Sequence, residues 1–377
     1  MCSTEECKER QAQNQVSEWE ATEETFDKLP TQRIMDRHLA VAKYRRSAAG
    51  DTRRRPPRTL LQLEKTWQHL LTIFVRQSIH SNMSPRSLRN TVSFVDDRVR
   101  AVQTDFVVLQ EASSSLQAQL VRYQLICCYL LSEVPRQHYE PKFARRALWT
   151  ALTAYWNDDS QHGIHDDEIL CYTALCQVAT CLIQQDKMHG IIGGWDDDSP
   201  QVGFGTILLL AHRCLPTKSY PKFEYALGIV TQAILGFHRN ILSLLSKGND
   251  AFSILCRCCM APALNVIRIG AIRQYNKAFG KLEKISGLEM ARLLFLPSAK
   301  SALEFGAAVG LPIEDDTIVM KAAPVSMSSP LYWSRQEDAF VFGKSLEDDC
   351  GRVDEEGVLI PPESLLQSLI VSDDLNA

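Results

Sequence analysis

The stretch "TLLQLEKTWQHLLTIF" (residues 59–74) shows how most of this chain is built. Thr59 and Gln62 form a capping-box pattern, in which side chains at a helix start bond backbone amides that lack helical partners. Apolar residues then recur at steps of three and four, which places them on one helical face; they are Leu60, Leu63, Trp67, Leu70, Leu71 and Phe74. The stretch therefore predicts an amphipathic helix.

Helical periodicity continues to about residue 280. Apolar stripes run through 95–109 and 116–130, and further helices are predicted at 141–156, 166–185, 204–214, 221–245, 251–260 and 261–279. Two helices begin alike, in "YEPKFARRAL" (139–148) and "YPKFEYAL" (220–227). Proline suits a first helical turn, because its missing N–H would have no partner there. Many amphipathic helices without strands favour an all-α fold with a solenoid-like body of stacked helix pairs.

The pattern changes near Ser286. Two short helices are predicted in "GLEMARLLFL" (287–296) and "SAKSALEFGAAVG" (298–310), followed by short strands in "TIVMK" (317–321) and "DAFVF" (338–342). This order predicts a small winged-helix unit. Its second helix offers Lys300 beside Glu304 and is otherwise small and apolar, which favours a protein contact over the reading of a DNA groove.

Four parts follow from these patterns. They are an N-terminal helical segment (1–30), a helical-repeat body (31–280), a winged-helix unit (281–345) and an acidic, mostly disordered tail (346–377). Within the tail, "PPESLLQSLIV" (361–371) is amphipathic enough to form a short helix that docks on the body or on a partner.

Charge is distributed unevenly, although the formal net charge of −4 is too small to indicate a partner. Residues 31–60 hold nine Arg and Lys against two acids, whereas residues 346–377 hold nine acids against one Arg. Three partners for the basic stretch compete: nucleic acid, an import receptor, or the acids of a neighbouring helix. The candidate nucleic-acid-binding residues are Lys43, Arg53, Arg54, Arg55 and Arg58.

The sequence contains few candidate reactive sites. The chain has no phosphate-binding Gly loop, HExxH or GxSxG. The cluster "HGIHDDE" (162–168), with His162 and His165, could hold a metal, but its acids suit a helix start better. The 12 cysteines include no CxxC pair, which argues against zinc and favours a reducing compartment. We expect no enzyme, no cofactor and no metal.

Location is predicted from what the chain lacks. The polar start "MCSTEECKER" is no secretory signal, and the apolar runs are shorter than the ~20 residues of a membrane span. The expectation is an intracellular protein without a membrane partner.

Four segments, in this order, resemble the suppressor-of-actin/germinal-centre-associated nuclear protein (Sac/GANP) family: "MCSTEECKER" (1–10), "VAKYRRSAAGD" (41–51), "RRPPRTL" (54–60) and "FVDDRVRAVQTDF" (94–106). The resemblance covers roughly residues 1–310. The residues of this chain that carry the family motif are Tyr44, Arg45, Arg46, Ser47, Gly50, Asp97, Arg98, Arg100 and Asp105.

This resemblance implies a TPR-like, PCI-type helical repeat that ends in a winged helix. It implies a non-enzymatic scaffold in nuclear mRNA export or processing, which binds a PCI-domain protein, a small acidic proteasome/export subunit and RNA. A short-chain branch implies centrosome duplication and spindle organisation instead, and the shared architecture leaves a proteasome-lid-like subunit as a third alternative. The expected location is the nucleus, with cytoplasm or centrosome as alternatives. The long helix for a centrin-type partner has no counterpart here, so that partner is not expected.

The motif residues also suggest an arrangement. Asp97 and Arg100 stand one helical turn apart and are expected to pair, with Arg98 and Arg100 on the polar side of their helix. We expect Arg45 and Arg46 to lock helices together, while Arg53–Arg55 and Arg58 stay exposed.

Overall fold

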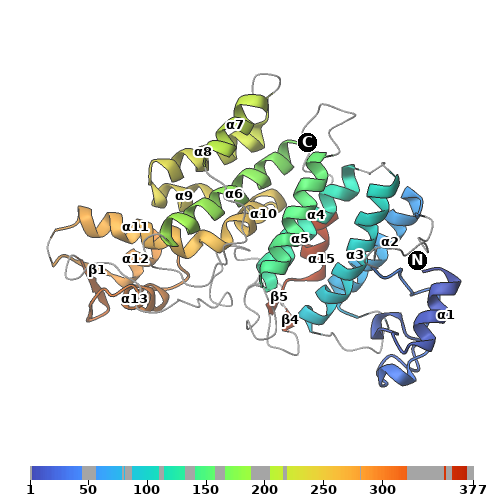
Figure 1. Cartoon of the computed structure of the whole chain (residues 1–377). Helices are drawn as coiled ribbons and strands as arrows, with labels where there is room; N and C mark the ends of the chain where they lie inside the picture. The colour runs from blue at the N-terminus through green and yellow to red at the C-terminus, as the bar shows by residue number, and fades with distance from the viewer. Residues whose placement is uncertain are drawn as a thin grey trace. The chain divides into compact units, whose positions relative to one another are not determined.

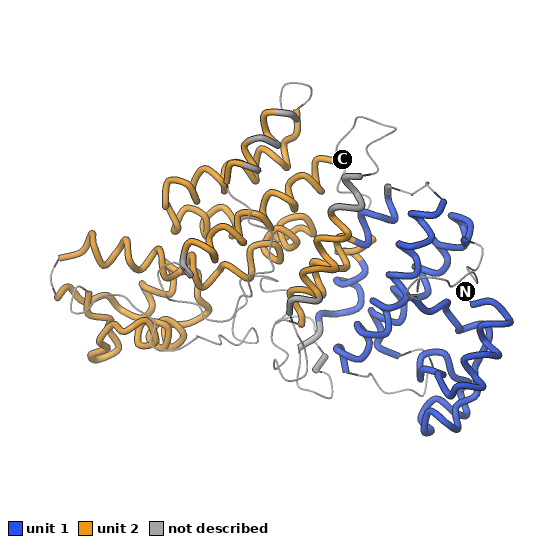
Figure 2. The backbone as a smooth tube through the Cα atoms, viewed as in Figure 1, with its two compact units in different colours: residues 1–120, 137–139, 351–367 blue, residues 121–136, 140–350, 368–377 orange. Residues whose placement is uncertain are grey.

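The computed structural model describes residues 2–44, 57–78, 80, 87–109, 114–131, 141–157, 166–187, 204–214, 219–280, 282–320, 352–353 and 359–371. This part of the chain is predominantly helical, which confirms the predicted all-α class (Figure 1). The chain forms two compact units (Figure 2). Unit 1 holds residues 1–120, 137–139 and 351–367, and unit 2 holds residues 121–136, 140–350 and 368–377. The four predicted parts remain a prediction.

Unit 1 is built around a pair of helices, α2 (Leu60–Arg76) and α3 (Leu88–Leu109), which pack against each other. Before them come α1 (Thr4–Ala12) and two single 3-10 turns, η1 (Glu18–Glu20) and η2 (Pro30–Gln32). The predicted capping box is present, because Thr59 accepts from the Gln62 amide and Gln62 accepts from the Thr59 amide. Five of the predicted apolar residues are buried: Leu63, Trp67, Leu70, Leu71 and Phe74.

The boundary between the units falls within α4 (Ser114–Leu130). Unit 2 continues with α5 (Pro141–Asn157), α6 (Asp167–Lys187), α7 (Phe204–Cys214) and α8 (Pro221–Ile234). It goes on to α9 (His238–Leu245), α10 (Ala251–Met260), η4 (Ala261–Ala263) and α11 (Leu264–Ala278). Helix α6 packs against α8 and α10. Both α5 and α8 begin at the predicted prolines.

One predicted helix is broken. The expected continuous stretch 221–245 ends at Ile234 and resumes at His238. The chain turns at Gly236, whose φ of 73° lies in the left-handed region that glycine adopts without a steric penalty. The break creates two helices, α8 and α9, that pack against each other.

The segment Ala251–Ala278 passes a length and composition test for a membrane span, although no span was expected. However, 72% of its most apolar window is buried inside the protein. Burial of this kind is typical of core helices.

The last part of unit 2 contains β1 (Lys284–Ser286), α12 (Gly287–Leu294), α13 (Ala299–Ala308), β2 (Ile313–Glu314) and β3 (Thr317–Val319). The strands form an antiparallel sheet in the order β1-β3-β2. Ser286 and Ser298 cap the two helices by accepting from backbone amides. The two helices and the strand at 317–319 confirm the prediction, whereas β1 and β2 were not anticipated. The predicted strand 338–342 lies outside the described residues.

The amphipathic stretch near the C-terminus is helical, as expected. Helix α15 (Glu363–Val371) follows a short hairpin of β4 (Arg352–Val353) and β5 (Leu359–Ile360). Its Leu366, Leu369 and Ile370 are fully buried. In unit 2, Arg122 Nη1 donates to the Ile370 carbonyl at 3.2 Å.

Candidate functional site

The two flanks of the basic stretch are described, but its centre is not. The motif and candidate residues Arg45, Arg46, Ser47, Gly50, Arg53, Arg54 and Arg55 lie outside the described residues. What the structure defines is how the chain is held at residues 41–44 and again at Arg58.

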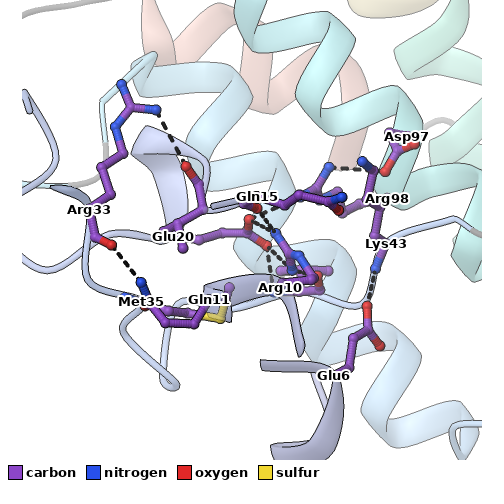
Figure 3. A network of polar contacts seen from close by, with 12 residues as sticks. Glu6, Arg10, Gln11, Gln15, Glu20, Arg33, Met35, Lys43, Asp97 and Arg98 are labelled. Carbon is purple, nitrogen blue, oxygen red and sulfur yellow. Dashed lines mark hydrogen bonds and ion pairs between the residues drawn. The ribbon is translucent and has the colours of Figure 1, made fainter. Parts of the chain in front are cut away.

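The N-terminal flank rests on a buried carboxylate, Glu20, which is 0% exposed. Its Oε1 accepts from Arg10 Nη1 at 3.1 Å and from the Val41 amide at 3.1 Å. Its Oε2 accepts from Arg10 Nη2 and, at 2.9 Å, from Arg98 Nη2 (Figure 3). One carboxylate thus joins α1, η1, the chain at residue 41 and α3, because each of its lone-pair sites has a donor.

The two terminal nitrogens of Arg10 also bond to backbone carbonyls. Its guanidinium donates to the carbonyls of Val41 and Gln15, each at 3.2 Å. Burial by itself would lower the pKa of Arg10, but hydrogen bonding and charge attraction from Glu20 raise it above its ordinary value. Arg10 is therefore a permanent cation inside unit 1, and its role is to bridge segments that are distant in sequence.

Lys43 and Tyr44 are held by their backbone amides. The Lys43 amide donates to Glu6 Oε1 at 2.9 Å, and the Tyr44 amide donates to Asp97 Oδ2 at 3.4 Å. The same Asp97 oxygen accepts from Arg98 Nη1 at 2.9 Å (Figure 3). Arg98 also lies over the Phe94 ring, 4.1 Å from its centroid, which adds a cation–π contact.

The C-terminal flank is held by a second ion pair. Arg58 Nε donates to Asp105 Oδ2 at 2.6 Å, and the two residues are only 6% and 4% exposed. Asp97 and Asp105 are eight residues apart on α3, which corresponds to about 12 Å along the helix axis. A single helix therefore fixes both flanks of the basic stretch.

These contacts correct three expectations. Arg98 is 5% exposed, so it does not lie on a polar face. Asp97 pairs with Arg98 and not with Arg100, which is exposed. Arg58 does not stay exposed, because Asp105 holds it in the interior. Of the three competing partners for the basic stretch, an acid of a neighbouring helix is thus the one that binds Arg58: this acid is Asp105 on α3. The structure adds Arg10 and Glu20, which sequence patterns did not indicate.

The motif residues that the structure describes lie within the part of the chain shared with known proteins. The SAC3/GANP family model matches residues 1–315. The chain belongs to the SAC3/GANP family. A curated relative, SAC3 family protein 1 of Schizosaccharomyces pombe, is 24% identical over 331 residues, which is 84% of this chain and 30% of the relative. This chain therefore covers less than a third of that relative's length.

Elsewhere in this SAC3/GANP chain, the acids that follow His165 have structural roles. Asp167 accepts from the amides of Lys222 and Phe223 at 2.9 and 2.8 Å and so caps α8. Glu168 is fully buried and forms a two-pronged ion pair with Arg122, at 2.8 and 2.9 Å. His162 and His165 lie outside the described residues.

Most cysteines of the described residues pack as small apolar side chains. Those buried are Cys7, Cys127, Cys171, Cys176, Cys181, Cys256, Cys258 and Cys259. On α6 and α10, Cys171 Sγ lies 3.9 Å from Cys256 Sγ. Among the described residues, no group of three or more His, Cys, Asp or Glu is placed to hold a metal ion.

Proposed function

We propose that this protein is a non-enzymatic scaffold subunit in nuclear mRNA export or processing. The observation that carries the proposal is membership of the SAC3/GANP family over residues 1–315. The predominantly helical structure supports it, because packed helices present long surfaces for other proteins. The nucleus is the proposed location.

The proposed protein partners are a PCI-domain subunit and a small acidic subunit. We interpret the segment from β1 to β3 as a winged helix of the PCI type, with its helices and antiparallel strands as the support for this assignment. Large apolar residues are exposed within it, at Leu288 and Ile313, and just before it, at Leu282, which suits a protein contact. On α13, Lys300 lies 3.8 Å from Glu304, so its charge is partly balanced.

RNA is the proposed ligand of the basic stretch, through Lys43 and Arg53–Arg55. The supporting observations are the concentration of positive charge in the sequence of this stretch and the attachment of its two flanks, Tyr44 and Arg58, to α3. Arg58 is left out of the proposed contact, since its guanidinium pairs with Asp105 in the interior.

Affinity purification of the tagged protein, with and without RNase and read by mass spectrometry, tests the scaffold role. Recovery of a PCI-domain protein, a small acidic subunit and mRNA export factors is the expected result. Recovery of tubulin- and centrosome-associated proteins in their place would move the protein to spindle organisation. Recovery of proteasome particles would make it a lid-like subunit.

Charge reversal of Arg53, Arg54 and Arg55 to Glu tests the RNA contact. We expect weaker binding of single-stranded RNA and a salt dependence whose logarithmic slope is reduced by about 2, since each lost phosphate contact removes about 0.7. The melting temperature should not change. Arg58→Glu is the control with the opposite pattern, because it places a second acid beside Asp105 and should lower the melting temperature. A fall in melting temperature for the triple variant would make those arginines structural.

A further inference from the structure

The turn between α8 and α9 exposes three large apolar side chains. Ile234, Leu235 and Phe237 are 49%, 56% and 48% exposed, within four consecutive residues. Single exposed apolar residues are common on protein surfaces, but a cluster of this size points to a ligand. We call these three residues the turn patch.

The turn patch is held firmly by its own backbone and by α11. The Phe237 amide donates to the Gln232 carbonyl at 2.8 Å, and the Gly236 carbonyl accepts from the side chain of Gln274. Helix α9 lies directly on α11, because a Cβ added to Gly270 would stand 2.4 Å from the His238 ring. The exposed side chains are thus carried by a rigid support, which lowers the entropy lost on binding.

The surrounding sequence has a strong excess of positive charge. Residues 221–278 contain seven Arg and Lys but only two acids, in a chain whose net charge is −4. Two of the seven, Arg257 and Arg268, are buried and donate to backbone carbonyls. This leaves five cations toward the surface, against Glu224 and Asp250.

Three of these cations are close to the turn patch in sequence or stand on α11, the helix that supports it. Arg239 follows Phe237 by two residues, and its guanidinium is 5.7 Å from the centroid of the Phe295 ring. Arg273 adjoins Gln274, the residue that reaches the Gly236 carbonyl, and Lys277 stands one helical turn beyond it on α11. No acid occurs anywhere in α9 or α11.

We propose that the turn patch with Arg239, Arg273 and Lys277 is a second binding site for single-stranded RNA. An unpaired base stacks on the Phe237 ring, with Ile234 and Leu235 as the adjoining apolar surface, and the three cations contact the phosphates. Duplex nucleic acid does not fit, because its bases are already stacked on one another. The charge excess favours a polyanion over an apolar peptide. RNA as the ligand rests on the proposed function, but this site is separate from residues 43–55.

A pair of substitutions at one position tests the stacking. Phe237→Leu keeps the apolar bulk and removes the ring, whereas Phe237→Tyr keeps the ring. Both variants are made in the Arg53–Arg55→Glu background, in which only the second site remains; with a labelled oligo-uridine of about 12 nucleotides and fluorescence anisotropy, we expect Phe237→Leu to weaken the remaining binding about five- to a hundredfold. Phe237→Tyr should bind as that background does. Melting temperatures by circular dichroism confirm that both variants are folded.

Charge reversal tests the phosphate contacts. The double variant Arg273→Glu, Lys277→Glu should reduce the logarithmic salt slope by about 1.4. Lys300→Glu is the control, because Lys300 is 83% exposed in the same unit and lies on a different helix, α13. It should leave the slope unchanged.

The results separate this inference from the proposed function. One outcome would overturn the second site and leave the first. In it, the Arg53–Arg55 variant loses RNA binding, whereas Phe237→Leu and the double variant have no effect. A parent protein that binds no oligo-uridine would overturn both. If Phe237→Leu keeps RNA affinity but loses a purified protein partner, the turn patch is a protein docking surface and the inference is wrong.

Discussion

Glu20 is the residue on which the N-terminal part of unit 1 depends most. A single carboxylate without solvent contact accepts from two arginines and one backbone amide. Removal of one member of a buried ion pair leaves the other charge without compensation, which costs about 3–5 kcal/mol. We therefore expect Glu20→Gln to lower the free energy of unfolding by about this amount in urea titrations followed by circular dichroism.

Glu18→Gln is the comparison, because Glu18 lies in the same short turn with a partly exposed side chain, 3.9 Å from Arg33. Its substitution should cost less than about 1 kcal/mol, as for other surface pairs. Equal losses in the two variants would mean that Glu20 is no more important than a surface acid.

At the scale of the residue, sequence patterns located the motif but not its partners. Asp97, Arg98 and Asp105 were singled out, yet Arg98 pairs with a residue 78 positions away and Arg58 with one 47 positions away. Patterns of charge along a helix detect neighbours one turn apart, so they favoured Asp97 with Arg100. An ion pair between distant segments forms only when tertiary packing removes both groups from water, and single-sequence periodicity carries no trace of that.

Among the elements, α6 and α10 define a seam of thiols whose chemistry can be measured. Burial raises the pKa of Cys256 and of Cys259, and it raises the pKa of Cys181 to about 11. The thiolate is the reactive form, so at pH 7.5 these three cysteines should be alkylated by iodoacetamide far more slowly than in urea. Mass spectrometry of timed samples reports each cysteine separately.

The half-buried Cys128 serves as the internal comparison and should be labelled first among these four. A shift from pH 7.5 to pH 8.5 should increase native labelling of Cys181 about tenfold, because well below a pKa of about 11 the thiolate fraction rises about tenfold with each pH unit. Rapid labelling of Cys256 in the folded protein would show that α6 and α10 separate in solution.

Helical elements were well predicted wherever an apolar face and a start signal coincide, as at Thr59 and at Pro221. The break at Gly236 was missed, because the apolar period continues through it and a lone glycine is tolerated inside a helix. Strands β1 and β2 were missed because they have only three and two residues and no apolar run around them, whereas β3, with three residues, lies in the apolar run "TIVM" (317–320). The periodicity of apolar residues thus predicts long helices, whereas the formation of very short strands depends on tertiary packing.

At the scale of the whole molecule, the two proposed RNA sites lie in different compact units. The basic stretch belongs to unit 1, and the turn patch belongs to unit 2. A strand long enough to reach both sites would bind the second one as an intramolecular event, at an effective concentration set by the connecting nucleotides. A short strand would bind either site alone. Chain length should therefore change the affinity of this protein for RNA much more than base composition does.

Simultaneous binding at both sites should favour long RNA strands over short ones. An oligo-uridine of about 60 nucleotides should bind the parent protein at least about a hundredfold more tightly than one of about 12 nucleotides. The Arg53–Arg55 variant and the Phe237→Leu variant should each lose most of that gain while they retain affinity for the short strand at the intact site. Anisotropy titrations at one salt concentration, with both lengths and all three proteins, measure the gain directly. If the long strand binds only in proportion to its number of short sites, the two surfaces act independently and RNA does not bridge the units.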